Sequence, residues 1–370
     1  MNNKSSEIIA AGHICLDIIP SIESQANSLE SLLVPGKLIN AGPLNISTGG
    51  AVPNTGLALH NLGLSVELMG KIGNDPFGRI VLDLLKSHGS GLADGMICSD
   101  SVQTSYTVVI SSPNVDRIFI HYPGANDTFR ADNIDYKKIS GSRLFHFGYP
   151  PLMRTMYEDN GRELIDIFKR VKATDVTTSL DMALPDPASP AGKIDWVKLL
   201  AGLLKDVDVF LPSLDEILFM LGRGKVNDNE TVSTGLLKDI SAQLIDMGVA
   251  VVVIKLGAEG LYLRTTPDKN RLKAMGSGRP KELEAWIDFE LLLPCFKVDV
   301  VGATGAGDCA IAGFLAGLVK GLGPETTLTA AAAAGACNVE TADAVSGIVP
   351  WDRMQERIKT GWNRKPLTLV

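Results

Sequence analysis

Several features that mark other classes of protein are absent from this 370-residue sequence. No cluster of Lys and Arg with interleaved aromatic residues occurs, and the net charge is −7, which disfavours nucleic acid as a partner. No apolar run reaches the ~18–20 residues needed to span a bilayer. The first twenty residues are too polar to resemble a signal peptide. We therefore expect a soluble protein with no membrane partner.

Cysteine is also scarce. The five cysteines are an odd number and form no Cys-x-x-Cys pair, and most of them lie in apolar surroundings. Such residues are usually small members of the core. This use of cysteine favours a reducing compartment, so we predict a cytoplasmic location.

A Walker A phosphate-binding motif is missing as well. Gly-Lys occurs at 36–37, 70–71, 192–193 and 224–225, but Ser or Thr never follows. Any phosphate site must therefore be built from another motif.

What the sequence does contain is a repeated alternation of apolar strands and helices. This alternation predicts an α/β fold with a doubly wound, mostly parallel sheet flanked by helices. Asp75 and Pro76 predict a helix start, as N-cap and first helical residue. Strands are expected at 7–19, 66–72, 143–147, 176–180, 207–211 and 249–255, and helices at 53–62, 77–88, 157–173, 192–204 and 231–247.

Three stretches interrupt the alternation. Residues 33–48 and 104–122 are rich in β-branched and polar residues, with a turn predicted at 112–114, and we expect them to form a small antiparallel β-sheet lid. The α/β core would then comprise 1–32, 49–103 and 123–370. Residues 266–292 are polar and irregular, which predicts a surface insertion in the core.

A glycine-rich turn, Gly302-Ala-Thr-Gly-Ala-Gly-Asp308, lies between a predicted strand at 295–301 and an apolar helix at 308–320. A strand that enters a helix through glycines presents free backbone N–H groups at the positive end of the helix dipole. This arrangement binds anions, most often phosphates.

This turn has three competing interpretations, of which the dinucleotide site fails on context. Asp308 could simply cap its helix. Gly305-x-Gly307-x-x-Ala310 matches a relaxed dinucleotide fingerprint, but a second helix at 325–341 follows where that fingerprint requires a strand. Alternatively, Asp308 is the general base that accepts a proton from a substrate hydroxyl, while the amides of Gly305, Ala306 and Gly307 stabilise a transferring phosphoryl group.

Two separate signatures resemble those of the ribokinase-like (PfkB) carbohydrate kinase family. The C-terminal one is 301–308 with its helix, and the N-terminal one is Gly49-Gly-Ala-Val-Pro-Asn-Thr-Gly-Leu-Ala58, followed by 70–78. The resemblance implies a ribokinase-like core with a β-sheet lid and an ATP-dependent phosphotransferase activity.

The resemblance also implies site residues. On the substrate side it implies Asp17, which would bind sugar hydroxyls, the turn residues Gly49, Gly50 and Asn54, and Asn126 where the lid returns to the core. On the nucleotide side, Glu216 would act on the Mg²⁺–phosphate arrangement, although Ser213 and Glu216 also fit a helix capping box. The remaining implied nucleotide-binding residues are Ser213, Lys255, Gly257, Gly260, Thr304 and Asn338.

Two positions depart from the family pattern. Ser213 stands where Asn is usual, and Gly302 stands where many members carry an acid that is associated with a monovalent cation. ATP and Mg²⁺ are therefore expected as cofactors, whereas a monovalent cation is not implied.

The sequence thus predicts a kinase for a small sugar or sugar-like substrate, with a homodimer formed through the lid. A nucleoside kinase of the same fold and a metabolite-binding sensor with little turnover remain as alternatives.

Overall fold

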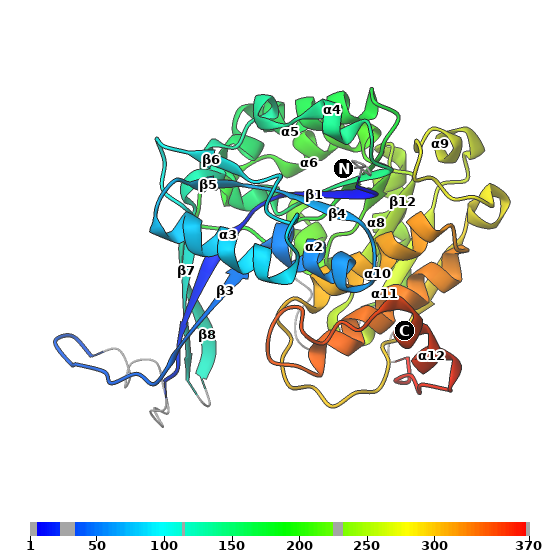
Figure 1. Ribbon diagram of the computed structural model, residues 1–370. Helices are drawn as coiled ribbons and strands as arrows, with labels where there is room; N and C mark the ends of the chain where they lie inside the picture. Colours follow the sequence, from blue (N-terminus) through cyan, green and yellow to red (C-terminus); the bar gives the residue numbers. More distant parts are fainter. Residues whose placement is uncertain (1–5, 23–33, 113–114, 225–231, 368–370) are drawn as a thin grey trace.

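The computed structural model describes residues 6–22, 34–112, 115–224 and 232–367. Its centre is an eight-stranded sheet with the order β14-β13-β12-β11-β10-β9-β1-β4 (Figure 1). All pairings from β12 to β4 are parallel, and β13 and β14 are added antiparallel at one edge. The strands are β1 (Ile8–Gly12), β4 (Val66–Met69), β9 (Leu144–Gly148), β10 (Thr177–Leu180), β11 (Val209–Phe210), β12 (Val251–Lys255), β13 (Leu261–Thr265) and β14 (Glu290–Leu293).

Helices cover both faces of this sheet and create two apolar cores. In β1, Ile8 and Ala10 belong to one core, and Ile9 and Ala11 belong to the other, because successive strand side chains point to opposite faces. The first core contains residues of α2 (Ala51–Asn61), α3 (Pro76–His88), α10 (Ala306–Lys320), α11 (Pro324–Val339) and α12 (Trp351–Lys359). The second contains residues of α5 (Arg154–Lys172), α6 (Trp196–Leu203), α7 (Leu214–Met220) and α8 (Thr234–Asp246). The predicted doubly wound α/β fold is confirmed.

The lid is a separate four-stranded sheet that projects from the core (Figure 1). Its order is β3-β2-β7-β8, with β2 (Cys15–Pro20), β3 (Leu44–Gly49), β7 (Tyr106–Ser112) and β8 (Val115–Tyr122). The β2–β7 pairing is parallel, and the two outer pairings are antiparallel. Residue 33 and the turn residues 113–114 of the predicted lid lie outside the described residues.

The prediction of one strand over 7–19 was wrong. The chain breaks at His13-Ile14, so that β1 stays in the central sheet while β2 joins the lid. Gly12 makes the break possible because it has a φ of +124°, and a Cβ there would lie 2.3 Å from the Gly148 carbonyl oxygen. Residues 66–72 are likewise split, between β4 and the small β5–β6 pair (Lys71–Gly73 and Ile97–Ser99).

Residues 266–292 are not the irregular insertion that we expected. They contain α9 (Lys269–Lys273) and the start of β14, and they bury Leu272, Met275 and Trp286. Trp286 packs edge-on against Phe314 of α10. A few widely spaced large residues anchor this segment among many polar ones, which is why its composition was misleading.

The strand predicted at 295–301 is also absent, since only Phe296 there forms an isolated bridge, to Arg364. The short α4 (Tyr136–Ile139) completes the described helices. No helix of the described part of the chain is both long and apolar enough to cross a membrane.

Candidate active site

Polar side chains converge where the parallel strands of the central sheet end. His13 follows β1, Tyr149 follows β9, Asp181 follows β10, and Lys255 is the last residue of β12. The carboxyl edge of a parallel sheet is where open α/β folds bind their ligands. A cleft of about 470 Å³ opens here, and Tyr149, Lys255 and Asp308 are among the residues that line it.

The glycine-rich turn forms one wall of this cleft. Helix α10 begins at Ala306, and its N-cap Gly305 has a φ of +75°, a conformation that glycine adopts without strain. A Cβ on Gly305 would lie 2.5 Å from the Ala344 carbonyl oxygen. The N–H of Ala306 makes a long turn bond of 3.3 Å to the Ala303 oxygen. First-turn amides of a helix have no partner within the helix, so this end faces the cleft with positive potential.

Asp308 lies in the first turn of α10, and its side chain is almost fully buried. The Asn54 amide of α2 donates to its Oδ2 at 3.0 Å, and the Thr55 hydroxyl approaches Oδ1 at 3.4 Å. Burial raises the pKa of Asp308 above its ordinary value, although these donors and the charge of Lys255 oppose the shift. The carboxylate is thus held in place by neutral donors and is a stronger base than a solvated aspartate.

Tyr149 is a site residue that the sequence analysis missed. Its hydroxyl lies 2.9 Å from both carboxylate oxygens of Asp308 and donates to them. The residue has a left-handed backbone, with φ of 63°, which is uncommon for a side chain of this size. Burial and the neighbouring Asp308 raise its pKa well above the ordinary value, so the hydroxyl keeps its proton. Its signal in the sequence was a polar aromatic residue directly after a buried strand and before Pro150-Pro151.

Lys255 faces the same cleft next to the glycine-rich turn, where a Cβ on Gly307 would lie 3.6 Å from its Cδ. Its Nζ contacts Asp181 Oδ1 at 2.5 Å, and both side chains are largely buried. Burial alone would lower the pKa of Lys255, but the carboxylates of Asp181 and Glu216 raise it above the ordinary value, so the side chain is a cation. Asp181 was not among the predicted residues, although it too directly follows a strand.

The predicted substrate residues lie on both sides of the hinge between core and lid. Asp17 is on β2, and Gly49 on the neighbouring β3 pairs with Cys15; a Cβ on Gly49 would lie 2.2 Å from Asp17 Oδ2, so glycine leaves room for this carboxylate. Burial raises the pKa of Asp17. Gly50 has a φ of +96° and is the N-cap of α2, which carries Asn54. The structure therefore brings Asp17, Gly49 and Gly50 together and places Asn54 against Asp308.

Asn126 does not face the cleft. It is fully buried, accepts from the Ile14 N–H at 3.2 Å and donates to the Ile14 oxygen at 2.9 Å. Its amide holds the break between β1 and β2, and its predicted contact with substrate stays a prediction.

Asn338 also has a structural contact, and its predicted nucleotide contact stays a prediction. It is fully buried, and its amide donates to the Thr304 oxygen at 2.7 Å. It therefore fixes the glycine-rich turn from behind. Thr304 itself is exposed at the rim of the turn.

The other predicted nucleotide residues line the cleft: Ser213, Glu216, Lys255, Gly257 and Gly260. Ser213 and Glu216 form the capping box of α7, in which the Ser213 N–H donates to Glu216 Oε2 at 2.6 Å. The capping role is thus present, and Glu216 is at the same time in the cleft. Gly302 has no side chain to bind a cation, and its N–H bonds to the Val339 oxygen.

Comparisons with known proteins agree with this geometry. The model of the family described as "pfkB family carbohydrate kinase" matches residues 10–351. Fructokinase-2 of Oryza sativa subsp. japonica is 24% identical over 315 residues, which cover 85% of this chain and 80% of the relative.

Two solved structures share the fold. They are the ribokinase of Arabidopsis thaliana, complexed with ribose and ATP, with a TM-score of 0.72 and 20% identity, and the fructokinase of Xylella fastidiosa with bound ATP, with a TM-score of 0.71 and 19% identity. Each match covers 96% of this chain and 99% of the other.

Proposed function

Because this chain belongs to the pfkB family of carbohydrate kinases, we propose that it transfers the γ-phosphoryl group of ATP to a hydroxyl of a small sugar or sugar-like molecule, with Asp308 as the general base. The observation that carries the proposal is the position of Asp308. A buried carboxylate with a raised pKa stands at the amino end of α10, in a cleft that also holds the Lys255 cation.

The proposed chemistry needs a base and an anion site within reach of each other. Asp308 accepts the proton of the substrate hydroxyl while that oxygen attacks the γ-phosphorus. The first-turn amides at 305–307 and Lys255 stabilise the negative charge on the transferring group. The amides are fixed by the helix backbone, and Lys255 is fixed by its buried ion pair with Asp181. This stabilisation therefore requires no rearrangement during the reaction.

The acidic residues of the cleft suit a magnesium ion that is held mainly by phosphates and water. Glu216 lines the cleft, and Asp181 Oδ2 is buried without a hydrogen-bond partner in the described residues. When bound, Mg²⁺ would neutralise phosphate charge. Asp181 would contact the ion directly, and Glu216 would hold it through a bound water molecule.

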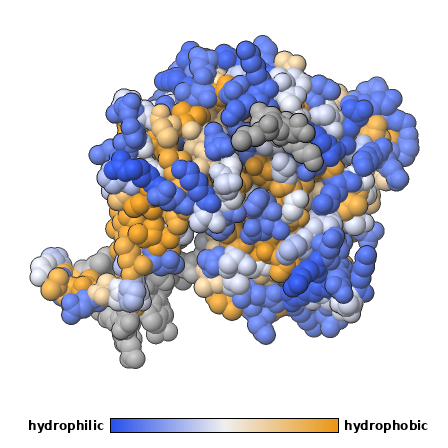
Figure 2. Space-filling view, in the orientation of Figure 1, coloured by the Kyte–Doolittle hydropathy of each residue, from blue (hydrophilic) through white to orange (hydrophobic). Residues whose placement is uncertain are grey.

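The lid supplies the other half of the substrate site in this proposal. Asp17 would accept hydrogen bonds from sugar hydroxyls, and closure of the lid would exclude water that otherwise hydrolyses ATP. The lid also exposes Leu44, Phe119, Ile120 and Tyr122, and Figure 2 shows apolar surface over this part of the molecule. Since β8 and β3 are edge strands, we propose that a second copy covers this face and forms a homodimer. The cytoplasmic location stays a prediction.

A panel of sugars and nucleosides, assayed for ATP consumption, tests the proposal. The Asp308→Asn variant should lose ~10²–10⁴-fold or more in kcat with the accepted sugar. Asp246→Asn is the matched control, because Asp246 is exposed at the end of α8, which precedes the amino end of β12. Near-normal turnover by Asp308→Asn would overturn the mechanism. Acceptance of nucleosides alone would overturn the substrate class, and ATP binding without any accepted substrate would favour a sensor.

A further inference from the structure

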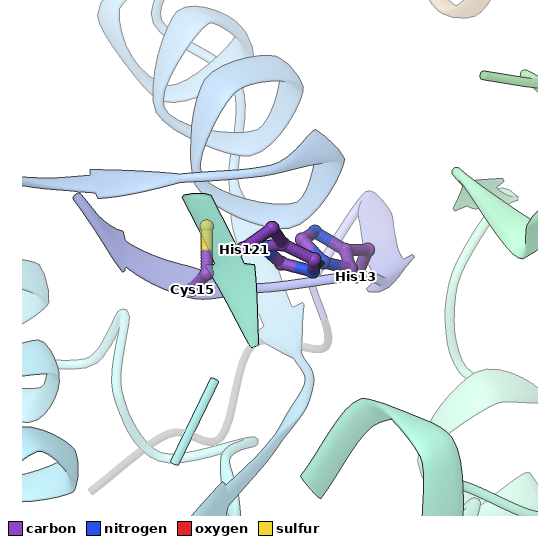
Figure 3. Close-up of side chains that lie close together, drawn as sticks. All are labelled: His13, Cys15 and His121. Atoms are coloured by element: carbon purple, nitrogen blue, oxygen red, sulfur yellow. Dashed lines mark hydrogen bonds between the residues drawn. The ribbon is translucent and has the colours of Figure 1, made fainter. Parts of the chain in front are cut away.

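A second cluster of reactive side chains lies at the hinge between the core and the lid, and the phosphoryl-transfer chemistry does not use it. His13 is in the break between β1 and β2, Cys15 is the first residue of β2, and His121 is on β8. One ligand atom from each lies within 4.8 Å of the others. Figure 3 shows the two imidazole rings side by side, with the Cys15 side chain next to them.

The spacing of these atoms suits a tetrahedral transition-metal ion. With metal–nitrogen distances of about 2.0–2.1 Å, two histidine nitrogens on a tetrahedral zinc ion are roughly 3.4 Å apart. The Nε2 atoms of His13 and His121 are 3.4 Å apart. A thiolate sulfur would lie roughly 3.6 Å from each nitrogen in such a site. Since the ligand atoms of the cluster lie within 4.8 Å of one another, the Cys15 sulfur is at most roughly 1.2 Å farther from a histidine nitrogen than in such a site.

The surroundings leave these nitrogens available as ligands. His121 Nδ1 lies 3.0 Å from the Thr107 hydroxyl, and this bond orients Nε2 toward His13. Histidine ligands of metals are oriented by such bonds from their other nitrogen.

A hydrogen bond between the His13 and His121 rings is the competing explanation for their close approach, and it fits the observed distance poorly. The 3.4 Å separation is long for an N–H···N bond. His13 Nδ1 is buried and has no partner in the described residues, whether Nε2 bonds to His121 or to a metal, so this atom does not distinguish the two explanations. The long distance between the two Nε2 atoms is therefore the observation that disfavours a direct bond.

We propose that His13, Cys15 and His121 bind a zinc-like divalent ion, with one coordination position left for water or a substrate hydroxyl. Cys15 donates its thiol proton to Asp17 Oδ1, and metal binding would release that proton to solvent and leave a thiolate. Two imidazoles and one thiolate are ligands that zinc prefers, whereas Mg²⁺ prefers oxygen ligands. His121 is exposed, which gives the ion a path of entry.

The position of this site determines its effect. Asp17 Oδ1 lies 3.3 Å from the Cys15 sulfur, so the ion binds beside the acid that is proposed to hold the sugar. It also joins β8 of the lid to the hinge. The bound ion therefore closes the sugar end of the cleft and inhibits phosphorylation, a consequence that rests on the proposed function.

Cobalt replaces zinc as a visible probe of the site. Addition of Co²⁺ to the metal-free full-length protein should give a thiolate-to-cobalt charge-transfer band and the intense visible bands of tetrahedral coordination, at one ion per chain, and Zn²⁺ should remove both. Cys15→Ser should abolish the charge-transfer band. Thr107→Val should weaken zinc binding by about 10–100-fold, because it removes the bond that orients His121.

Cys98→Ser is the matched control, because Cys98 is an exposed free cysteine outside the cluster, and it should bind like wild type. The inference is overturned if no tetrahedral spectrum appears, or if Cys15→Ser keeps the charge-transfer band. Circular dichroism of each variant excludes loss of the fold as the cause of a lost signal.

A kinase assay in excess Mg²⁺ tests the inhibitory effect. Zn²⁺ should inhibit wild type and the Cys98→Ser control at the concentration that fills the cobalt-detected site, and a zinc-selective chelator should restore turnover. Full activity with the site filled would overturn the inhibitory role. Zinc binding by a protein that phosphorylates no sugar would leave the metal site intact and refute the proposed function instead.

Discussion

The contact between Tyr149 and Asp308 is the residue-level feature that most affects the proposed chemistry. The Tyr149 hydroxyl occupies both oxygens of the proposed base in the absence of substrate. A substrate hydroxyl must share or replace this donor to give up its proton to Asp308. Tyr149 is thus a candidate positioning residue. Its substitution would change the pKa of Asp308 and leave the Asp308 carboxylate in place.

Tyr149→Phe should move the acid limb of the kcat/KM profile to higher pH. The lost donor stabilises the ionised carboxylate, and a hydrogen bond to a charged group contributes about 1.5–3 kcal/mol, which corresponds to about one to two pH units. The measurement is the pH dependence of turnover with the accepted sugar. Tyr157→Phe, on α5, is the control for loss of a tyrosine hydroxyl elsewhere. An acid limb unchanged by Tyr149→Phe would show that the contact does not tune the base.

Asp308→Asn should increase the stability of the fold while it removes activity. The pKa of Asp308 is raised above the ordinary 3.8, so the ionised carboxylate opposes folding at neutral pH. Relative to the variant, wild type should lose stability as the pH rises from 3.8 through the raised pKa of Asp308. The loss should be about 1.4 kcal/mol for each pH unit by which folding raises that pKa. Urea unfolding at several pH values measures this difference. A variant that is less stable than wild type at neutral pH would contradict the raised pKa.

The residues that the sequence could indicate are those in recognisable motifs. The turn at 302–308 and the pair Gly49-Gly50 are contiguous in the chain, so their chemistry was visible without a structure. Tyr149 and Asp181 are single residues after strands, and only the sheet topology shows that those strands end at the same edge. Asn126 and Asn338 show that a polar side chain near a motif can also bind the backbone behind it, which the sequence does not reveal.

At the level of elements, the close packing of α10 and α11 holds the anion site. Gly313 of α10 faces the backbone of α11, where a Cβ would lie 2.5 Å from the Ala330 oxygen and 2.8 Å from the Ala334 Cβ. The run of alanines at 330–334 allows this approach. Small residues on both helices are therefore required for the position of Asp308 at the cleft.

Gly313→Ala should destabilise the protein by about 1–3 kcal/mol, because the added methyl group overpacks this contact. Gly235→Ala is the matched control within α8, where the nearest atom to an added Cβ is 3.7 Å away. That control should instead stabilise the fold by about 0.5–1 kcal/mol, since alanine favours the helix. Chemical denaturation measures both, and equal effects of the two substitutions would refute the packing argument.

Element boundaries were predicted best where capping residues mark them. Asp75 accepts a hydrogen bond from the Gly78 N–H at the start of α3, as its sequence context indicated. The strand break at His13-Ile14 carries no such mark, because the buried run of β1 continues across it into Cys15 and Leu16. Periodicity within one segment cannot show which of two sheets each half will join.

At the scale of the whole molecule, the exposed apolar face of the lid has the clearest consequence. β8 is an edge strand, and Phe119 and Ile120 are more than half exposed on it. Such a surface is usually covered by a partner.

Ile120→Lys should convert a homodimer into a monomer, because a lysine on an edge strand opposes pairing with a second copy. Sedimentation velocity of wild type and variant measures whether each is a monomer or a dimer. Leu367→Lys, a change at an exposed apolar residue near the C-terminus, should leave the dimer intact. A monomeric wild-type protein would refute the proposed dimer.

The break between β1 and β2 has one more consequence, for the length of the molecules that can react. It places Asp17 and Gly49 on the lid, whereas Asn54 and Asp308 stay on helices of the core. In the proposed function, a substrate would therefore span the hinge, with one end at Asp17 on the lid and the other at Asp308. A polyol too short to contact both Asp17 and Asp308 would leave the lid open, so the hinge would select substrates by their length.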